Sequence, residues 1–75
     1  MKQTYRYSVT TEIDGKTYTG SRIVEGTRKL FQTIYYGHQS RFDGHPYKPS
    51  EEATMEGIAR IILCELVRES SESNG

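Results

Sequence analysis

The side chains best suited to chemistry lie in one short stretch rich in glycine and proline, residues 37–49. They can transfer protons or stabilise a phosphate, as similar groups do in small hydrolytic enzymes. These side chains are His38, Arg41, His45, Tyr47 and Lys48. No acid or base elsewhere in the chain partners them in a recognisable pattern. We therefore predict no catalytic residues and classify the chain as a non-enzyme.

Four side chains are of types that bind metal ions: His38, Asp43, His45 and Cys64. A structural zinc site needs four ligands, among them a closely spaced pair of Cys or His residues. No pair here has that spacing, so we predict no metal site and no other cofactor. Cys64 is the only cysteine, which excludes a disulfide within one chain and indicates a reducing compartment, the cytoplasm.

The length of 75 residues allows one small domain, and a domain of this size buries only about 60% of the surface of its unfolded chain. Such domains regain stability through disulfides, metals or oligomerisation, and oligomerisation is the route left here. Residues 1–48 hold eight Lys or Arg against four Asp or Glu, whereas residues 49–75 hold two against six. This division indicates either two oppositely charged faces or an ordinary solvated surface. No stretch approaches the roughly 18 apolar residues of a membrane-spanning helix, so we predict no membrane contact.

The N-terminal third of the chain has the pattern of a β-hairpin. Residues 4–13 alternate between one set of mostly aromatic or β-branched side chains and one set of polar side chains, the period of a half-buried strand. Asp14-Gly15 is a typical two-residue hairpin turn, and residues 16–24 suit the returning strand. Gly20 within that strand indicates a bulge that resets the register.

The middle of the chain is less clear. Residues 28–36 suit a third strand, because their composition is rich in Thr, Ile and Tyr, and a short helix at 27–36 is the alternative. Residues 37–49 suit a long loop. Loops of this length are uncommon in compact domains and are often functional.

The last third predicts an amphipathic helix from about Ser50 to Glu69. Its apolar stripe should cover the sheet and consists of Met55, Ile58, Ala59, Ile62 and Leu66, with Leu63 at its edge. The fold class is therefore α+β: a three-stranded antiparallel meander with one C-terminal helix on one face. We expect one domain over residues 1–69 and a disordered polar tail over residues 70–75.

A second strip lies on the opposite side of the helix: Ala53, Gly57, Ile61 and Cys64. A glycine in mid-helix costs up to about 1 kcal/mol relative to alanine, and small residues let another backbone come close. We therefore predict self-association of the chain as a homodimer, with Gly57 near its counterpart. The alternative is that residues 37–49 fold back over this strip.

The predicted function is that of a small non-enzymatic binding protein acting through protein–protein contacts. A regulator, adaptor or inhibitor of the accessory type encoded by phages and prophages has this size, and we expect no small-molecule substrate. Residues expected to hold the partner lie in the 37–49 loop: Arg41, Phe42, His45 and Tyr47. An arginine and two aromatic rings in one segment are typical of an interface anchor.

Nucleic-acid binding is the alternative function. The N-terminal half combines positive charge with aromatic rings, which suits contacts to phosphates and stacking on bases. The cations expected to carry this function are Arg6, Lys16, Arg22, Arg28 and Lys29. The zero net charge of the whole chain is far from the basic footprint of most nucleic-acid-binding domains.

Overall fold

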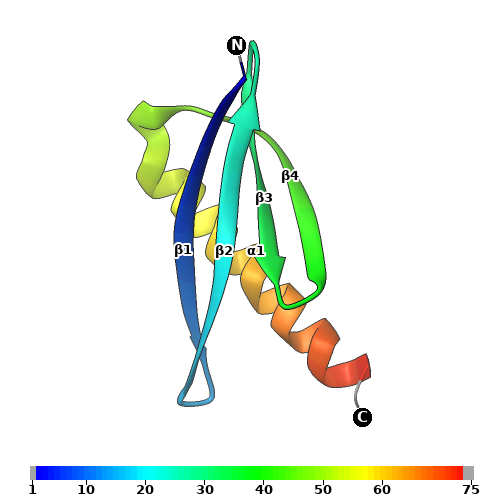
Figure 1. The fold of residues 1–75 in the computed structure, drawn as a ribbon. Coiled ribbons are helices and arrows are strands. Elements are labelled where there is room, and N and C mark those ends of the chain that lie inside the picture. Colours follow the sequence, from blue (N-terminus) through cyan, green and yellow to red (C-terminus); the bar gives the residue numbers. More distant parts are fainter. Residues whose placement is uncertain (1, 74–75) are drawn as a thin grey trace.

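The structure is a computed structural model that describes residues 2–73, and side chains as far as residue 71. It consists of a four-stranded antiparallel sheet in the order β1-β2-β3-β4 and one helix that crosses a single face of that sheet (Figure 1). The elements are β1 (Gln3–Ile13), β2 (Lys16–Gly26), β3 (Leu30–Tyr36), β4 (Gln39–Tyr47), a 3₁₀ turn (Pro49–Glu51) and α1 (Glu52–Ser73). The predicted class, an antiparallel α+β meander with a C-terminal helix, is confirmed, but the predicted number of strands is wrong.

The first hairpin forms as predicted. Asp14 and Gly15 both have positive φ, 51° and 81°, which gives the two-residue turn the twist of the flanking strands. The predicted bulge at Gly20 is absent, since β1 and β2 pair in unbroken register from Gln3 to Ile13. Gly20 is required for another reason: a Cβ atom there would lie 2.5 Å from the carbonyl oxygen of Tyr35 and 2.8 Å from Leu63 Cδ1.

The fourth strand occupies the segment predicted to be a loop. A tight turn at Gly37, which has a φ of 60°, reverses the chain after β3, and Gln39–Tyr47 then pairs with Leu30–Tyr36. A register shift between Phe31 and Thr33 accommodates the irregular β4. The alternative of a short helix over residues 27–36 is also wrong, because β3 lies there and the strand assignment of this segment is correct.

The helix α1 buries the predicted stripe. Met55, Ala59, Ile62, Leu63 and Leu66 are all buried against the sheet, and the remaining member, Ile58, is partly buried. Their main partners are Val9, Val24 and Ile34, which point from β1, β2 and β3 toward the helix. In Figure 1 the helix runs diagonally, and its N-terminal end projects past the β1 edge.

The helix ends at Ser73 rather than near Glu69. The first residues of the expected disordered tail, Ser70 and Ser71, are therefore helical, and residues 74–75 lie outside the described part of the chain. The helix starts at Glu52, after the 3₁₀ turn, and Ser50 does not cap it. Because α1 covers one face only, the opposite face of the sheet stays open.

Candidate functional site

The open face of the sheet carries the most distinctive exposed surface. Pairing across the four strands aligns Arg6, Ile23, Thr33 and Phe42 in one row. Their neighbours in sequence along β2, β3 and β4, including Arg22, Gln32 and Asp43, are buried toward the helix. The alternation of side chains along each strand thus turns this row to the side away from α1.

Four apolar side chains gather on this face: Ile23, Phe31, Tyr35 and Phe42, here called the open-face patch. The Phe31 and Phe42 rings lie 5.6 Å apart between centroids and are inclined by 41°. Phe42 is 62% exposed and Tyr35 is 39% exposed, whereas Ile23 and Phe31 are half-buried. Two exposed and two half-buried apolar side chains on one sheet face are typical of an interaction surface, since single exposed apolar residues are the ordinary case.

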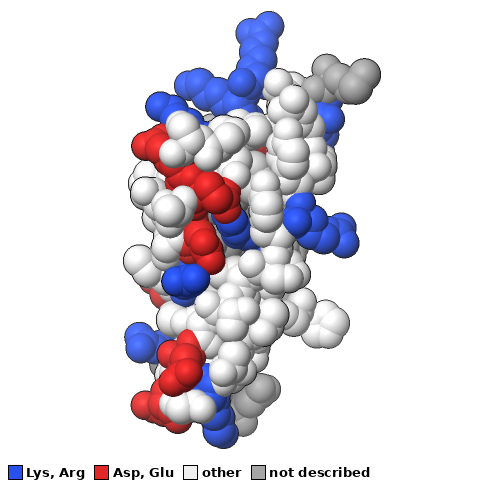
Figure 2. All heavy atoms as spheres, turned by 90° about the vertical axis from the view of Figure 1, so that its left-hand side faces the viewer, with Lys and Arg blue, Asp and Glu red and all other residues white. Residues whose placement is uncertain are grey.

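Unpaired cations border the open-face patch. Arg6 lies in the same row as Phe42, and Arg28 and Lys29 occupy the turn between β2 and β3. None of the three makes an ion pair with a described residue, whereas Lys2 nearby is 3.1 Å from Glu25. Figure 2 shows several Lys and Arg side chains at the top of the view, acidic side chains along its left side, and further Lys and Arg side chains among and below the acidic ones. The division of charge seen in the sequence is not a clean division in space, because Arg22 and Arg41 form ion pairs with glutamates of α1.

A cavity of about 510 Å³ lies beside the β2–β3 turn. Its apolar lining comes from Leu30, Pro46 and Tyr47, and its cations are Arg28, Lys29 and Lys48. Pro46 pairs in register with Phe31, so the cavity adjoins the open-face patch. This arrangement suits a group that carries an apolar part and a negative charge.

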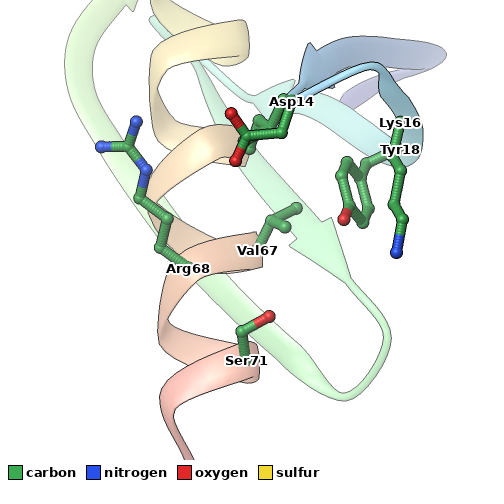
Figure 3. Close-up of a pocket in the computed structure, with 7 residues that line it drawn as sticks. Asp14, Lys16, Tyr18, Val67, Arg68 and Ser71 are labelled. Carbon is green, nitrogen blue, oxygen red and sulfur yellow. The ribbon is translucent and has the colours of Figure 1, made fainter.

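A second cavity, of about 440 Å³, lies between the β1–β2 hairpin and the C-terminal half of α1. Ile13, Tyr18 and Val67 supply apolar surface, Lys16 and Arg68 supply positive charge, and Asp14 supplies negative charge. Figure 3 shows Lys16 and Arg68 on opposite sides of Val67, so the two cations do not converge on one point. A small anion would therefore contact one of them at a time.

A network of charged and polar side chains joins the sheet to the helix. Arg22, only 3% exposed, forms an ion pair with Glu52 and donates to the side-chain oxygen of Gln32, 3.2 Å away. The Gln32 amide donates to Asp43 at 3.0 Å and to the Met55 carbonyl at 2.9 Å. The Arg22 guanidinium also lies 4.4 Å from the centre of the Tyr7 ring. The polar groups of this network bond to one another within the chain. The network therefore holds the fold together and leaves few free polar groups for a ligand.

Asp43 extends this network toward the surface through His45. Their side chains are 2.7 Å apart, and the His45 backbone amide also donates to Asp43. Burial raises the pKa of the Asp43 carboxyl, but hydrogen bonds from Gln32 and His45 lower it more, and the net pKa falls below its ordinary value of 3.8. The Asp43 carboxylate can hold the His45 ring in one orientation. His45 lines neither of the two cavities described above.

The predicted partner-binding loop is a strand, and its four residues do not form one site. Phe42 faces the open side, and Tyr47 is buried with its hydroxyl donating to Glu52. Arg41 reaches toward the helix, where it donates to Glu65 at 2.7 Å and to Glu69 at 2.5 Å. His45 is exposed beside Asp43. Alternation along β4 separates these side chains, which a loop would have allowed to converge.

The predicted self-association strip is largely open to solvent. Ile61 is 64% exposed, Ala53 is exposed, and the space above Gly57 is empty to 4 Å. Residues 37–49 do not fold back over the strip, because most of them form β4, Gln39–Tyr47. Cys64 differs from the others: its sulfur lies 3.1 Å from the Thr11 hydroxyl of β1, at the side of the helix that meets the sheet.

The predicted nucleic-acid set is also divided. Arg22 is unavailable to a ligand because it is buried in the network. Lys16 lies at the β1–β2 hairpin, at the opposite end of the sheet from Arg28 and Lys29, while Arg6 lies on the open face. Three residues of the open-face patch, Ile23, Phe31 and Tyr35, were not predicted as site residues. The alternation along residues 28–36 already places Phe31 and Tyr35 on one face of a strand, but only the pairing of β4 with β3 brings Phe42 beside them.

Within the described part of the chain, no three His, Cys, Asp or Glu side chains lie close enough to hold a metal ion. No helix among residues 2–73 has the length and apolar character needed to cross a lipid bilayer. Comparison of the chain with protein-family models, with curated proteins and with solved structures gives no match.

Proposed function

We propose that this chain is a small non-enzymatic protein that binds another protein, with the open-face patch as its contact surface. The exposure of Phe42 carries the proposal: its ring is 62% exposed although it packs on Phe31 on the face of the sheet that the helix leaves open. Aromatic rings are enriched among the residues that dominate protein–protein binding energy. The role is that of a regulator, adaptor or inhibitor.

The charges around the open-face patch define the complementary surface. Arg6, Arg28 and Lys29 have no described anionic partner, and they border the apolar centre on two sides. A partner with an apolar contact surrounded by carboxylates matches this arrangement. Rim charges mainly raise the association rate, whereas the apolar centre sets the dissociation rate. Binding should therefore weaken only modestly as salt is raised.

The test is affinity capture from cells that naturally produce the chain, with three versions compared by quantitative mass spectrometry. These are the parent, Phe42→Ser and Ile61→Ser, which removes a side chain of nearly equal exposure, 64% against 62%, from the helix. A partner retained by Ile61→Ser and lost with Phe42→Ser supports the open-face patch. The proposal is wrong if every captured protein is retained by Phe42→Ser.

Single-stranded nucleic acid is the second candidate ligand. It is favoured by one observation, the alignment of Arg6 with the exposed Phe42 ring, because cations and stacking rings together bind single strands. Titration with fluorescent oligothymidylate at low and high salt tests this reading. Binding that falls steeply with salt and disappears in Phe42→Ser would replace the protein partner with a nucleic acid.

Self-association through the strip of Ala53, Gly57, Ile61 and Cys64 is a separate proposal. The exposure of Ile61 and the free space at Gly57 support it. The contact between Cys64 and Thr11 limits it, since that sulfur already has a partner in the sheet. Light scattering on Ile61→Glu measures how much this strip contributes to self-association.

A further inference from the structure

The edge strand β1 is long and regular. All of its residues from Gln3 to Ile13 pair with β2 without a bulge, and its other side forms one edge of the sheet (Figure 1). The opposite edge strand, β4, contains Pro46 and a register shift. Proline and bulges are the usual devices that stop an edge from pairing with another strand, and β1 has neither. Its free backbone groups can therefore accept a further strand.

The hairpin turn determines which backbone N–H and C=O groups of β1 point outward at that edge. In a two-residue hairpin the residues that flank the turn, here Ile13 and Lys16, form a hydrogen-bonded pair, and such pairs alternate along the ladder. Odd-numbered residues of β1 therefore bond to β2. Even-numbered residues, including Arg6, Ser8, Thr10 and Glu12, direct their N–H and C=O groups outward.

The sequence of β1 is complementary to itself. When two copies pair antiparallel about a two-fold axis at Val9, Arg6 of each copy lies directly opposite Glu12 of the other. Both are even-numbered, so the pair falls at a hydrogen-bonded position, as the free edge requires. Both side chains are exposed, and neither makes an ion pair with a residue that the structure describes. The symmetry provides this attraction twice.

The same register also matches side chains on the helix side of the sheet. Tyr5, which is 42% exposed in the single chain, comes opposite the half-buried Ile13 of the second copy. Pairs of an aromatic and a β-branched residue are among the favourable cross-strand contacts. Pairing therefore gives the exposed Tyr5 ring an apolar neighbour.

The position of the helix is consistent with this arrangement. The N-terminal end of α1 projects past β1 (Figure 1), and the contact of Glu52 with Arg22 places it near the first half of β1. The two-fold axis brings this end close to the β1–β2 hairpin of the second copy. There it meets the 440 Å³ cavity, whose lining holds two cations, Lys16 and Arg68, against one carboxylate, Asp14, and this net positive charge complements the exposed Glu51 (Figure 3).

We infer that the edge of β1 is a homodimer interface, in which a second copy of this chain pairs antiparallel about Val9 and joins the two sheets into one. The four side chains of the open-face patch stay free in this dimer, and Arg28 and Lys29 remain unpaired at its border, whereas Arg6 pairs with Glu12 of the second copy. The inference therefore does not depend on the proposed partner. It also differs from dimerisation through the exposed helix strip.

The test is a charge-swap series followed by analytical ultracentrifugation over a range of concentrations. Arg6→Glu opposes two glutamates across the interface and Glu12→Arg opposes two arginines, so each single change should raise the dimer dissociation constant about tenfold. The double variant, Arg6→Glu with Glu12→Arg, restores the pairing. An equimolar mixture of the two single variants should form a heterodimer, which native mass spectrometry distinguishes by mass.

A matched control is Arg28→Glu, which changes the charge by the same amount at the β2–β3 turn and should leave dimerisation unchanged. Hydrogen exchange gives a second readout, because the amides of Ser8 and Thr10 should be protected only at dimeric concentrations. The inference is overturned if the parent is a monomer at millimolar concentration. It is also overturned if the charge-swap series has no effect while Ile61→Glu dissociates the dimer.

Discussion

The rings of Phe31 and Phe42 pack against each other, 5.6 Å apart between centroids, on the face of the sheet that the helix leaves open. They belong to β3 and β4, and Thr33 is the register partner of Phe42, so the contact is diagonal across the strand pair. The contact is made in the folded chain without protecting Phe42 from solvent. A side chain in such a position contributes little to folding and is available for binding.

Replacing Phe42 by serine should separate stability from binding. Because the ring is 62% exposed, we expect a loss of about 1 kcal/mol or less in the free energy of unfolding, measured by urea titration. The affinity for the protein partner should fall at least tenfold. A large loss of stability would instead assign the ring a structural role.

Replacing Gln32 by leucine should strongly destabilise the fold. Its amide is fully buried and serves both Asp43 and the Met55 carbonyl, which would be left without that donor. We expect a loss of about 2–4 kcal/mol in the free energy of unfolding. Gln39→Leu is the control, because the Gln39 side-chain oxygen is buried without a hydrogen-bond partner in the described residues. An equal loss in both variants would contradict this account.

Asp43 should make the fold sensitive to acid. Its pKa in the folded chain lies below the ordinary value of 3.8, so the unfolded chain binds the proton more readily. The stability that the carboxylate contributes is therefore complete above about pH 4 and is lost as the pH falls through the lower, folded pKa. Asp43→Asn should flatten this part of the stability curve. A parent and variant with parallel curves between pH 2 and about pH 5 would exclude this role.

Gly20→Ala should destabilise the sheet, although it adds one methyl group. The new Cβ would lie 2.5 Å from the Tyr35 carbonyl oxygen, a backbone atom that cannot move without disturbing the sheet. We expect a cost of about 1–3 kcal/mol, seen as a lower melting temperature. Gly44→Ala, at a position with free space to 4 Å, is the matched control and should melt close to the parent.

Ile61→Glu distinguishes the two routes to self-association. The side chain is 64% exposed, so the variant should fold normally. The dimer formed through β1 predicts an unchanged mass in solution by light scattering. A monomeric variant would show instead that the helix strip forms the contact.

The first hairpin and the apolar stripe of the helix could be predicted because each has a local, regular pattern. The strand β4 could not, since Arg41 and Asp43 on its inner side are as polar as Ser40 on its outer side. No alternation of hydrophobicity therefore marks the strand, and Gly44 and Pro46 add the composition of a loop. Asp43 is tolerated inside only because Gln32 and His45 bond to it.

The open-face patch could not be predicted for the same reason, because it requires the strand β4, which the sequence pattern did not reveal. Phe42 was recognised as an anchor, but Phe31 and Tyr35 become its neighbours only when β4 pairs with β3. The burial of Arg22 follows from its place in β2, between the inward Gly20 and Val24. Its partner Glu52 lies thirty residues away, and no local pattern connects the two.

The buried network also restricts how the helix can sit on the sheet. Aliphatic side chains such as Leu63 and Leu66 tolerate repacking, and an apolar stripe alone would accept a helix shifted by one turn. The bond from Gln32 to the Met55 carbonyl and the ion pair of Arg22 with Glu52 exist at one helix position only. The polar contacts thus select a single arrangement among several of similar packing energy.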